Sequence, residues 1–218
     1  MPFCGKCGKE LPERASFCPS CGAEVTQTIS SKVMTPTSAG LFGRMVRAAR
    51  LETSLYEEVE ADPAATGQAM LAVAIASVCA GIGSGLDGIL RGLSGEATVF
   101  RLIFGVATAL FSWLVWSFVT YIVGTRVFGG TATYGELLRT IGFSDSPGAI
   151  RILTFVPLVG GVVSAIAFLW VLIAMVTAVR QALDFTTGKA ILTCIVGLIL
   201  LAVIAISLTL LSLPFLPI

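Results

Sequence analysis

Residues 64–86 read AATGQAMLAVAIASVCAGIGSGL and contain no charged side chain. A segment of this length and composition can cross the hydrocarbon core of a bilayer as an α-helix. The rest of the chain has the same character, because 56% of its 218 residues are hydrophobic and only 12% are charged. Soluble domains carry about 25% charged residues. We therefore expect an integral membrane protein.

Further apolar stretches extend this pattern to a helical bundle. Residues 102–125 and 190–218 are uncharged and long enough to cross a bilayer. Residues 152–179 are apolar but contain Pro157 and the pair Gly160-Gly161, which predict a helix break. We predict an all-α polytopic membrane bundle with five transmembrane helices, one of them short or broken. The predicted spans are residues 66–90, 102–125, 142–158, 162–182 and 190–213.

The distribution of Lys and Arg orients this bundle. With five spans and a cytosolic N-terminus, 11 Lys and Arg fall inside and 2 outside, whereas four spans give 10 inside and 4 outside. The positive-inside rule therefore favours five spans. The first residues, MPFC, lack a basic segment followed by an apolar one, so we expect no signal peptide.

Two cysteine pairs lie before the apolar region. Cys4 and Cys7 form one Cys-x-x-Cys pair, and Cys18 and Cys21 form the other. Four thiolates at this spacing match a closed tetrahedral site for structural Zn²⁺. Disulfides, unliganded thiols and a four-cysteine iron site are the alternatives. We predict a zinc ribbon over residues 1–25, and the pattern resembles the short N-terminal zinc ribbons of many prokaryotic membrane proteins.

The segment between the ribbon and the first span divides into two parts. Residues 26–40 are rich in Ser and Thr and are predicted to be a flexible linker. Residues 41–62 are predicted to form a pre-membrane amphipathic helix, followed by the membrane domain at residues 63–218. Arginines fill the first half of this helix and glutamates the second, which opposes the helix dipole. We therefore expect it to dock on the bundle or the membrane surface, with a solvated helix as the alternative.

Three charged residues lie inside or at the ends of predicted spans: Asp87, Asp145 and Arg151. Charge inside a membrane is costly and often functional. Asp145 and Arg151 flank Pro147-Gly148 and could pair across that turn, and Asp87 lies close to Arg91. The alternative is that all three residues lie at the membrane interface. Small residues also recur every four positions along the first span, which favours close helix packing; they are Ala72, Ala76, Ala80, Ser84 and Gly88.

Residues 136–148 read ELLRTIGFSDSPG and are followed by the break at Pro157 and Gly160-Gly161. This stretch resembles the Yip (Ypt-interacting protein) family of multi-span membrane proteins, and residues 51–68 resemble the pre-membrane segment of that family. The resemblance covers residues 40–213 and implies five spans with a cytosolic N-terminus. Eukaryotic members bind Rab-type GTPases, but the Asp-Leu-Tyr-Gly-Pro motif of some of them is absent here. The resemblance therefore implies a topology and not an activity.

The function predicted from these features is non-enzymatic. The chain has no histidine, the commonest general base, and no nucleophile–base pair at useful spacing. We predict a membrane scaffold or adaptor whose zinc ribbon binds a partner. The alternative is a small transporter or channel that uses Asp87, Asp145 and Arg151. Net charge is +1, which does not favour nucleic acid as a partner.

The expected partners are the lipid bilayer and a cytosolic or membrane protein, with a homo-oligomer as an open alternative. A zinc ribbon fused to such a bundle is typical of prokaryotic proteins. We therefore expect a prokaryotic cell membrane, with the N-terminus in the cytosol.

Overall fold

The computed structural model describes residues 7, 20–22 and 40–212, with side chains as far as residue 203. The chain divides into two compact units, Met1–Ala39 and Gly40–Ile218. In the first unit only Cys7 and residues 20–22 are described. The predictions for Cys4, Cys18 and residues 26–39 lie outside the described residues.

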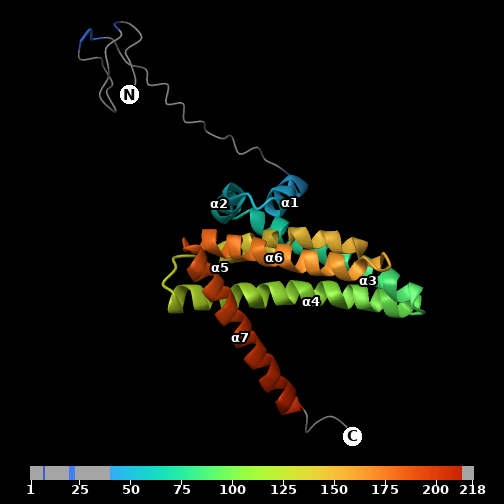
Figure 1. Cartoon of the computed structure of the whole chain (residues 1–218). Helices are drawn as coiled ribbons and strands as arrows, with labels where there is room; N and C mark the ends of the chain where they lie inside the picture. Colours follow the sequence, from blue (N-terminus) through green and yellow to red (C-terminus); the bar gives the residue numbers. More distant parts are fainter. Residues whose placement is uncertain (1–6, 8–19, 23–39, 213–218) are drawn as a thin grey trace. The chain divides into compact units, whose positions relative to one another are not determined.

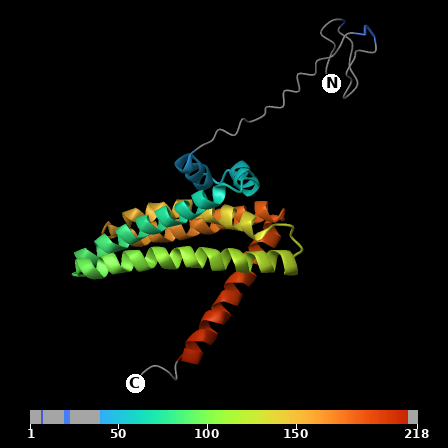
Figure 2. The ribbon, with the colours of Figure 1, turned by 180° about the vertical axis from the view of Figure 1, so that it is seen from behind.

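The described part of the second unit is helical, with no strand in residues 40–212 (Figure 1). Three helices are long and apolar enough to cross a membrane: α3, α6, and α4 together with the short π-helix η1 that continues it. The part of α7 whose side chains are described, Thr187–Val203, is a fourth and shorter apolar helix. Figures 1 and 2 show α7 running obliquely away from α4. The elements are α1 (Leu41–Ala49), α2 (Thr53–Ala61), α3 (Ala65–Leu90), α4 (Gly95–Ile122), η1 (Val123–Val127), α5 (Tyr134–Ser144), η2 (Ser146–Phe155), α6 (Gly160–Ala182) and α7 (Thr187–Ser212).

The single helix predicted at residues 41–62 is wrong, because the chain breaks between α1 and α2. Leu51 adopts a left-handed backbone with φ of 60°. The backbone N–H of Glu52 donates to the Arg47 carbonyl oxygen at 3.1 Å, which closes the end of α1. The break folds α2 back toward α1, so that arginines and glutamates that oppose the dipole of one long helix can face each other.

Two ends of the bundle can be distinguished by their contacts. At one end, Glu60 of α2 lies near Glu136 of α5 and near Asp184, which follows α6. At the other end, Arg91 after α3 shares a pocket with residues 156–158 between η2 and α6. The segment formed by α5 and η2 therefore runs from the Glu60 end to the Arg91 end.

This segment is the broken helix of the bundle, but the break differs from the prediction. The predicted span starts at residue 142, whereas the helical segment starts at Tyr134 and changes from α-helix to 3₁₀-helix around Asp145. The 11 residues of α5 rise by about 16 Å, and the 10 residues of η2 by about 20 Å. Together they nearly match the roughly 39 Å of the 26-residue α3. The steeper rise of the 3₁₀ form lets 134–155 reach from end to end.

The small residues of α3 make room for η2. A Cβ at Gly83 would collide with the Arg151 carbonyl oxygen and lie 2.5 Å from Thr154 Oγ1. Ala72 and Ala76 are buried as the predicted stripe requires, but the buried line continues at Gly83 and leaves Ser84 exposed. A helix has 3.6 residues per turn, so a row of every fourth residue drifts around its surface. The residues of α3 that contact η2 therefore do not keep to the predicted four-residue spacing.

Candidate functional sites in the ribbon and the bundle

Two of the four predicted zinc ligands, Cys7 and Cys21, lie among the described residues of the first unit. Cys7 and Cys21 are both exposed and both lie in turns. Gly22 follows Cys21 with φ of 64°, a conformation that favours glycine and turns the chain directly after the thiol. Four thiolates are the donor set that Zn²⁺ prefers in structural sites. Among the described residues no group of three or more metal-ligating side chains occurs, and the other two predicted ligands lie outside them.

A buried arginine ties α1 to α2 and α3. Arg44 Nε donates to Glu58 Oε1 and Arg44 Nη2 donates to Asp62 Oδ2, both at 3.0 Å. A third bond, 3.1 Å long, runs from Arg44 Nη1 to Gln68 Oε1 at the start of α3. Only 8% of the Arg44 side chain is exposed. All three directions of the guanidinium are therefore used to fix the helices to one another.

Arg47 extends this cluster toward solvent. Its guanidinium pairs with Glu58 at 2.5 Å and with Glu52 at 3.0 Å. The hydrogen bond that Arg47 donates to the Glu58 carboxylate raises the pKa of Arg47 above its usual value. We call Arg44, Arg47, Glu58 and Asp62 the α1–α2 ion cluster.

A second buried arginine, Arg139 of α5, fixes the other end of α2. Arg139 Nε donates to the Val59 carbonyl oxygen at 2.8 Å, and Nη2 donates to the carbonyl oxygen of Glu60. A cation at the C-terminus of α2 also suits the helix dipole. Burial raises the pKa of the Glu60 carboxyl to about 7, with further contributions from Glu136 and Asp184. Trp170 Nε1 of α6 completes the docking by donating to the Ala49 carbonyl oxygen at 2.8 Å.

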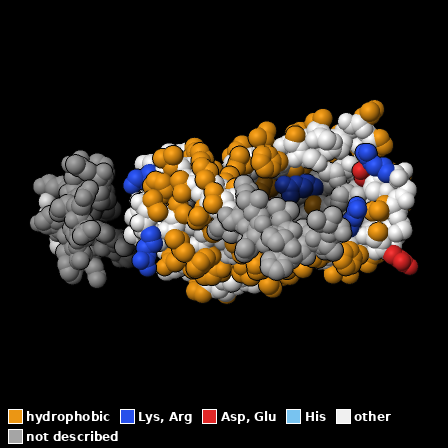
Figure 3. All heavy atoms as spheres, turned by 90° about the horizontal axis from the view of Figure 1, so that it is seen from below, with side chains coloured by type: hydrophobic (Ala, Val, Ile, Leu, Met, Phe, Trp, Pro, Cys, Tyr) orange, Lys and Arg blue, Asp and Glu red, His pale blue; other side chains and the backbone are white. Residues whose placement is uncertain are grey.

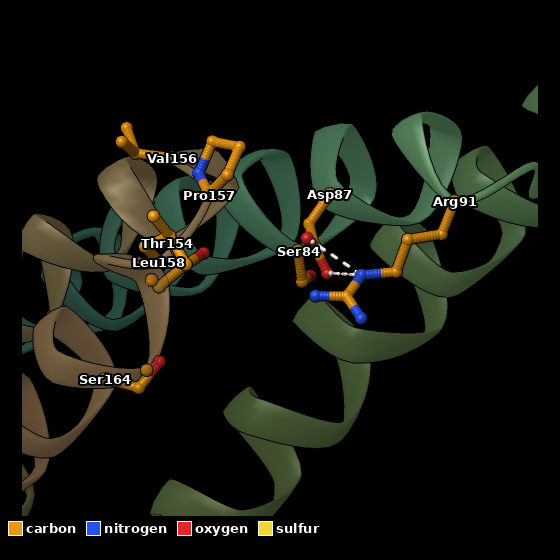
Figure 4. A pocket seen from close by; sticks show the side chains of 10 residues that line it. Ser84, Asp87, Arg91, Thr154, Val156, Pro157, Leu158 and Ser164 are labelled. Atoms are coloured by element: carbon orange, nitrogen blue, oxygen red, sulfur yellow. Dashed lines mark hydrogen bonds and ion pairs between the residues drawn. The ribbon is translucent and has the colours of Figure 1, made fainter.

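Asp87 lies at the Arg91 end of the bundle. Arg91 Nε and Asp87 Oδ2 are 2.9 Å apart, and 77% of the Arg91 side chain is exposed. Both line a pocket of about 430 Å³ together with the chain between η2 and α6. Figure 4 shows the pair on one side of this pocket and Thr154, Pro157 and Leu158 on the other. An exposed pair of this kind contributes little to stability.

Asp145 and Arg151 lie in a different cavity, so the three charged residues proposed for a transport path do not form one site. The cavity measures about 450 Å³ and is lined from α3, α4, α5, α6 and α7. The sequence left open whether Asp145 pairs with Arg151. No ion pair joins them and neither side chain has a hydrogen-bond partner among the described residues, although Arg151 lies near enough to Asp145 for their charges to interact. Most other lining residues are apolar, including Trp113, Trp116 and Phe168.

Helices, ribbon cysteines and apolar surface together define an integral membrane protein headed by a zinc ribbon. Hydrophobic side chains cover much of the described surface in the view of Figure 3. The family model of the Yip1 domain matches residues 53–209, and the model of a zinc-ribbon domain matches residues 3–25. The chain belongs to the Yip1 family, which confirms the resemblance found in the sequence. Searches of curated proteins and of solved structures each returned no match.

Sequence reasoning missed the two buried arginines that dock α2. Arg139 stands in an otherwise apolar and small-residue context, LLRTIG, at residues 137–142. A single cation in such a helix needs a partner, and that signal could have pointed to a helix end or a carboxylate nearby. Arg44 could not be separated from its neighbours Arg47 and Arg50 before the break at Leu51 was known.

Proposed function

We propose that this chain is a non-enzymatic membrane scaffold or adaptor in which the zinc ribbon binds a protein partner on the cytosolic side. The observation that carries the proposal is the division of the chain into two units. One matches a zinc-ribbon domain and carries the four cysteines of a closed metal site, and the other is a membrane bundle. Structural zinc stabilises a short module that is too small to bury a sufficient core.

Contacts within the bundle support the orientation with five spans. The connections before α5 and after α6 lie at the same end as α2, because Glu136 and Asp184 both lie near Glu60. The connections after α3 and after η2 lie at the opposite end. This alternation supports five successive crossings, with the N-terminal segment on the cytosolic side that the distribution of Lys and Arg favours.

The charged side chains of the bundle favour a scaffold over an enzyme. Arg44, Arg47 and Arg139 are bound to carboxylates or carbonyl oxygens that join one helix to another. Such contacts fix a shape and leave these groups unable to act on a substrate. A scaffold needs this rigidity, because the bundle must hold the ribbon at the membrane while a partner binds.

The proposal is tested by chemical crosslinking of the full chain in native membranes. Cys7→Ser with Cys21→Ser removes two metal ligands, and Ser20→Ala changes the same turn without touching a thiol. We expect the double variant to lose its zinc and its crosslinked partners while it stays in the membrane at the wild-type level. Ser20→Ala should keep both. A partner set that is unchanged after zinc is lost would show that the ribbon is not the adaptor.

A further inference from the structure

The cavity that holds Asp145 and Arg151 lies within the membrane-crossing part of the bundle. A Cβ at Gly148, between these two residues, would lie 3.6 Å from Val171 Cγ2 and 3.7 Å from the Ala76 Cβ. Val171 is the midpoint of α6, and Ala76 is close to the midpoint of α3. Asp145 Oδ1 is 3.5 Å from the same position. The carboxylate therefore lies level with the middle of two helices that can cross a membrane.

The charges of Asp145 and Arg151 interact with each other, but neither side chain has the hydrogen bonds or the close ion pair that such a place requires. A carboxylate and a guanidinium taken out of water cost several kcal/mol each unless hydrogen bonds or opposite charges compensate them. The guanidinium has five N–H donors and the carboxylate accepts at two oxygens, yet neither bonds to a described residue. Trp116 lines the same cavity and is only 9% exposed. Its buried indole N–H also has no hydrogen-bond partner among the described residues.

Part of the cavity lining is exposed on helices that we expect to face hydrocarbon. This part includes Phe168 of α6 and Leu198 of α7, which are 61% and 52% exposed. Both belong to apolar helices, and α7 diverges from the rest of the bundle (Figures 1 and 2). A ligand that enters here comes from the bilayer. Its apolar part would meet Trp113, Leu172 and the other apolar lining, and its polar part would meet Asp145 and Arg151.

We propose that this cavity is a binding site for one zwitterionic phospholipid with a primary ammonium, of the phosphatidylethanolamine type. Its phosphate complements the Arg151 guanidinium, and its ammonium complements the Asp145 carboxylate. An acyl chain fills the apolar cavity, whose volume of about 450 Å³ falls in the roughly 300–1,000 Å³ range of small-molecule sites. One anion and one cation that do not pair with each other select a ligand that carries both charges.

The headgroup chemistry gives a specific test. Phosphatidylcholine carries the same charges, but its quaternary ammonium has no N–H to donate to a carboxylate. Phosphatidylglycerol offers a phosphate and no cation. The proposal therefore orders the three lipids: the ethanolamine lipid binds best, and the other two bind more weakly.

The experiment is native mass spectrometry of the full chain, purified in detergent with equal amounts of the three lipids bearing identical acyl chains. We expect the wild type to retain one ethanolamine lipid more than about tenfold better than either competitor, because only its ammonium can donate hydrogen bonds to the Asp145 carboxylate. Asp145→Asn should remove the preference for ethanolamine over choline. Arg151→Gln should lower the retention of all three lipids. The matched controls are Asp87→Asn and Arg91→Gln, which alter the ion pair of the other pocket and should change nothing.

Equal retention of the three lipids by the wild type, or a preference that survives Asp145→Asn, would overturn the proposal. If the charge variants fail to fold, Ala109→Leu provides a second route, because Ala109 lines the cavity and is only partly buried. The added isopropyl group should displace the lipid whatever its headgroup. Unchanged retention by folded Ala109→Leu would likewise contradict this site. The outcome is independent of the ribbon, so it does not depend on the proposed adaptor function.

Discussion

Both the Glu60 end of the bundle and the Asp145–Arg151 cavity contain arginines and carboxylates, but these groups form ion pairs and hydrogen bonds only at the Glu60 end. At the Glu60 end every described arginine of the α1–α2 ion cluster is bound, and Arg139 caps α2. In the cavity an arginine and an aspartate share one space without a bond. The difference teaches that charge in this protein has two uses. Bound charge fixes the helices to one another, and unbound charge in an apolar cavity marks a place for a ligand.

The largest expected effect follows from breaking the α1–α2 ion cluster. Arg44→Ala removes two ion pairs and the hydrogen bond to Gln68; it leaves Asp62 partly buried without its partner and leaves Glu58 paired with Arg47 alone. Removing one partner of a buried pair costs about 3–5 kcal/mol; because 20% and 33% of these carboxylate side chains are exposed, we expect about 2–3 kcal/mol. The measurement is the free energy of unfolding in mixed micelles.

Arg50→Ala is the matched control for this change. Arg50 is exposed and has no ion-pair partner among the described residues. Its removal should alter the free energy of unfolding by less than about 0.5 kcal/mol. Equal losses in the two variants would mean that the cluster does not stabilise the docking of α1 and α2.

A smaller loss of stability is expected where α3 packs against η2, the segment that contains Arg151. Gly83→Val places a branched side chain where even a Cβ collides with the Arg151 carbonyl oxygen. Overpacking of this kind costs about 1–3 kcal/mol, and it should move η2 and weaken lipid retention as well. Gly105→Val on α4 is the control, because a Cβ there has nothing within 4 Å. Retention that falls equally in both variants would argue that the position of η2 does not matter.

The sequence predicted the helical bundle, the family and the helix break, because these depend on hydropathy, proline and glycine along the chain. The turn at Leu51 could not be predicted, since a leucine with positive φ is set by the contacts of Arg44 and Glu58 on either side of it. The separation of Asp87 from Asp145 depends on the path of η2, whose 3₁₀ form changes the rise of the chain. Asp145 and Arg151 are six positions apart, which left a pair possible; the structure places both in one cavity without an ion pair between them.

The smallest expected effect concerns pH at the Glu60 end. The pKa of Glu60 is raised to about 7, mainly by burial and then by the carboxylates of Glu136 and Asp184, while Arg139 opposes the shift. The unfolded value is about 4.3, so the docked state binds the proton more tightly. Docking of α2 is therefore most stable below about pH 4.3 and loses stability as the pH rises through about 7, by about 1 kcal/mol after allowance for solvent screening.

Glu60→Gln should remove this pH dependence, because the amide does not titrate and the Glu60 carbonyl oxygen that binds Arg139 belongs to the backbone. The measurement is the rate of proteolysis between α1 and α3 at a series of pH values, normalised to a peptide substrate. Glu96→Gln, an exposed carboxyl at the start of α4, is the control and should keep the wild-type slope. A slope that persists in Glu60→Gln would show that Glu60 is not the group responsible for it. The contrast with the cavity would then rest on the arginines alone, because the α2 carboxylate would no longer take part in it.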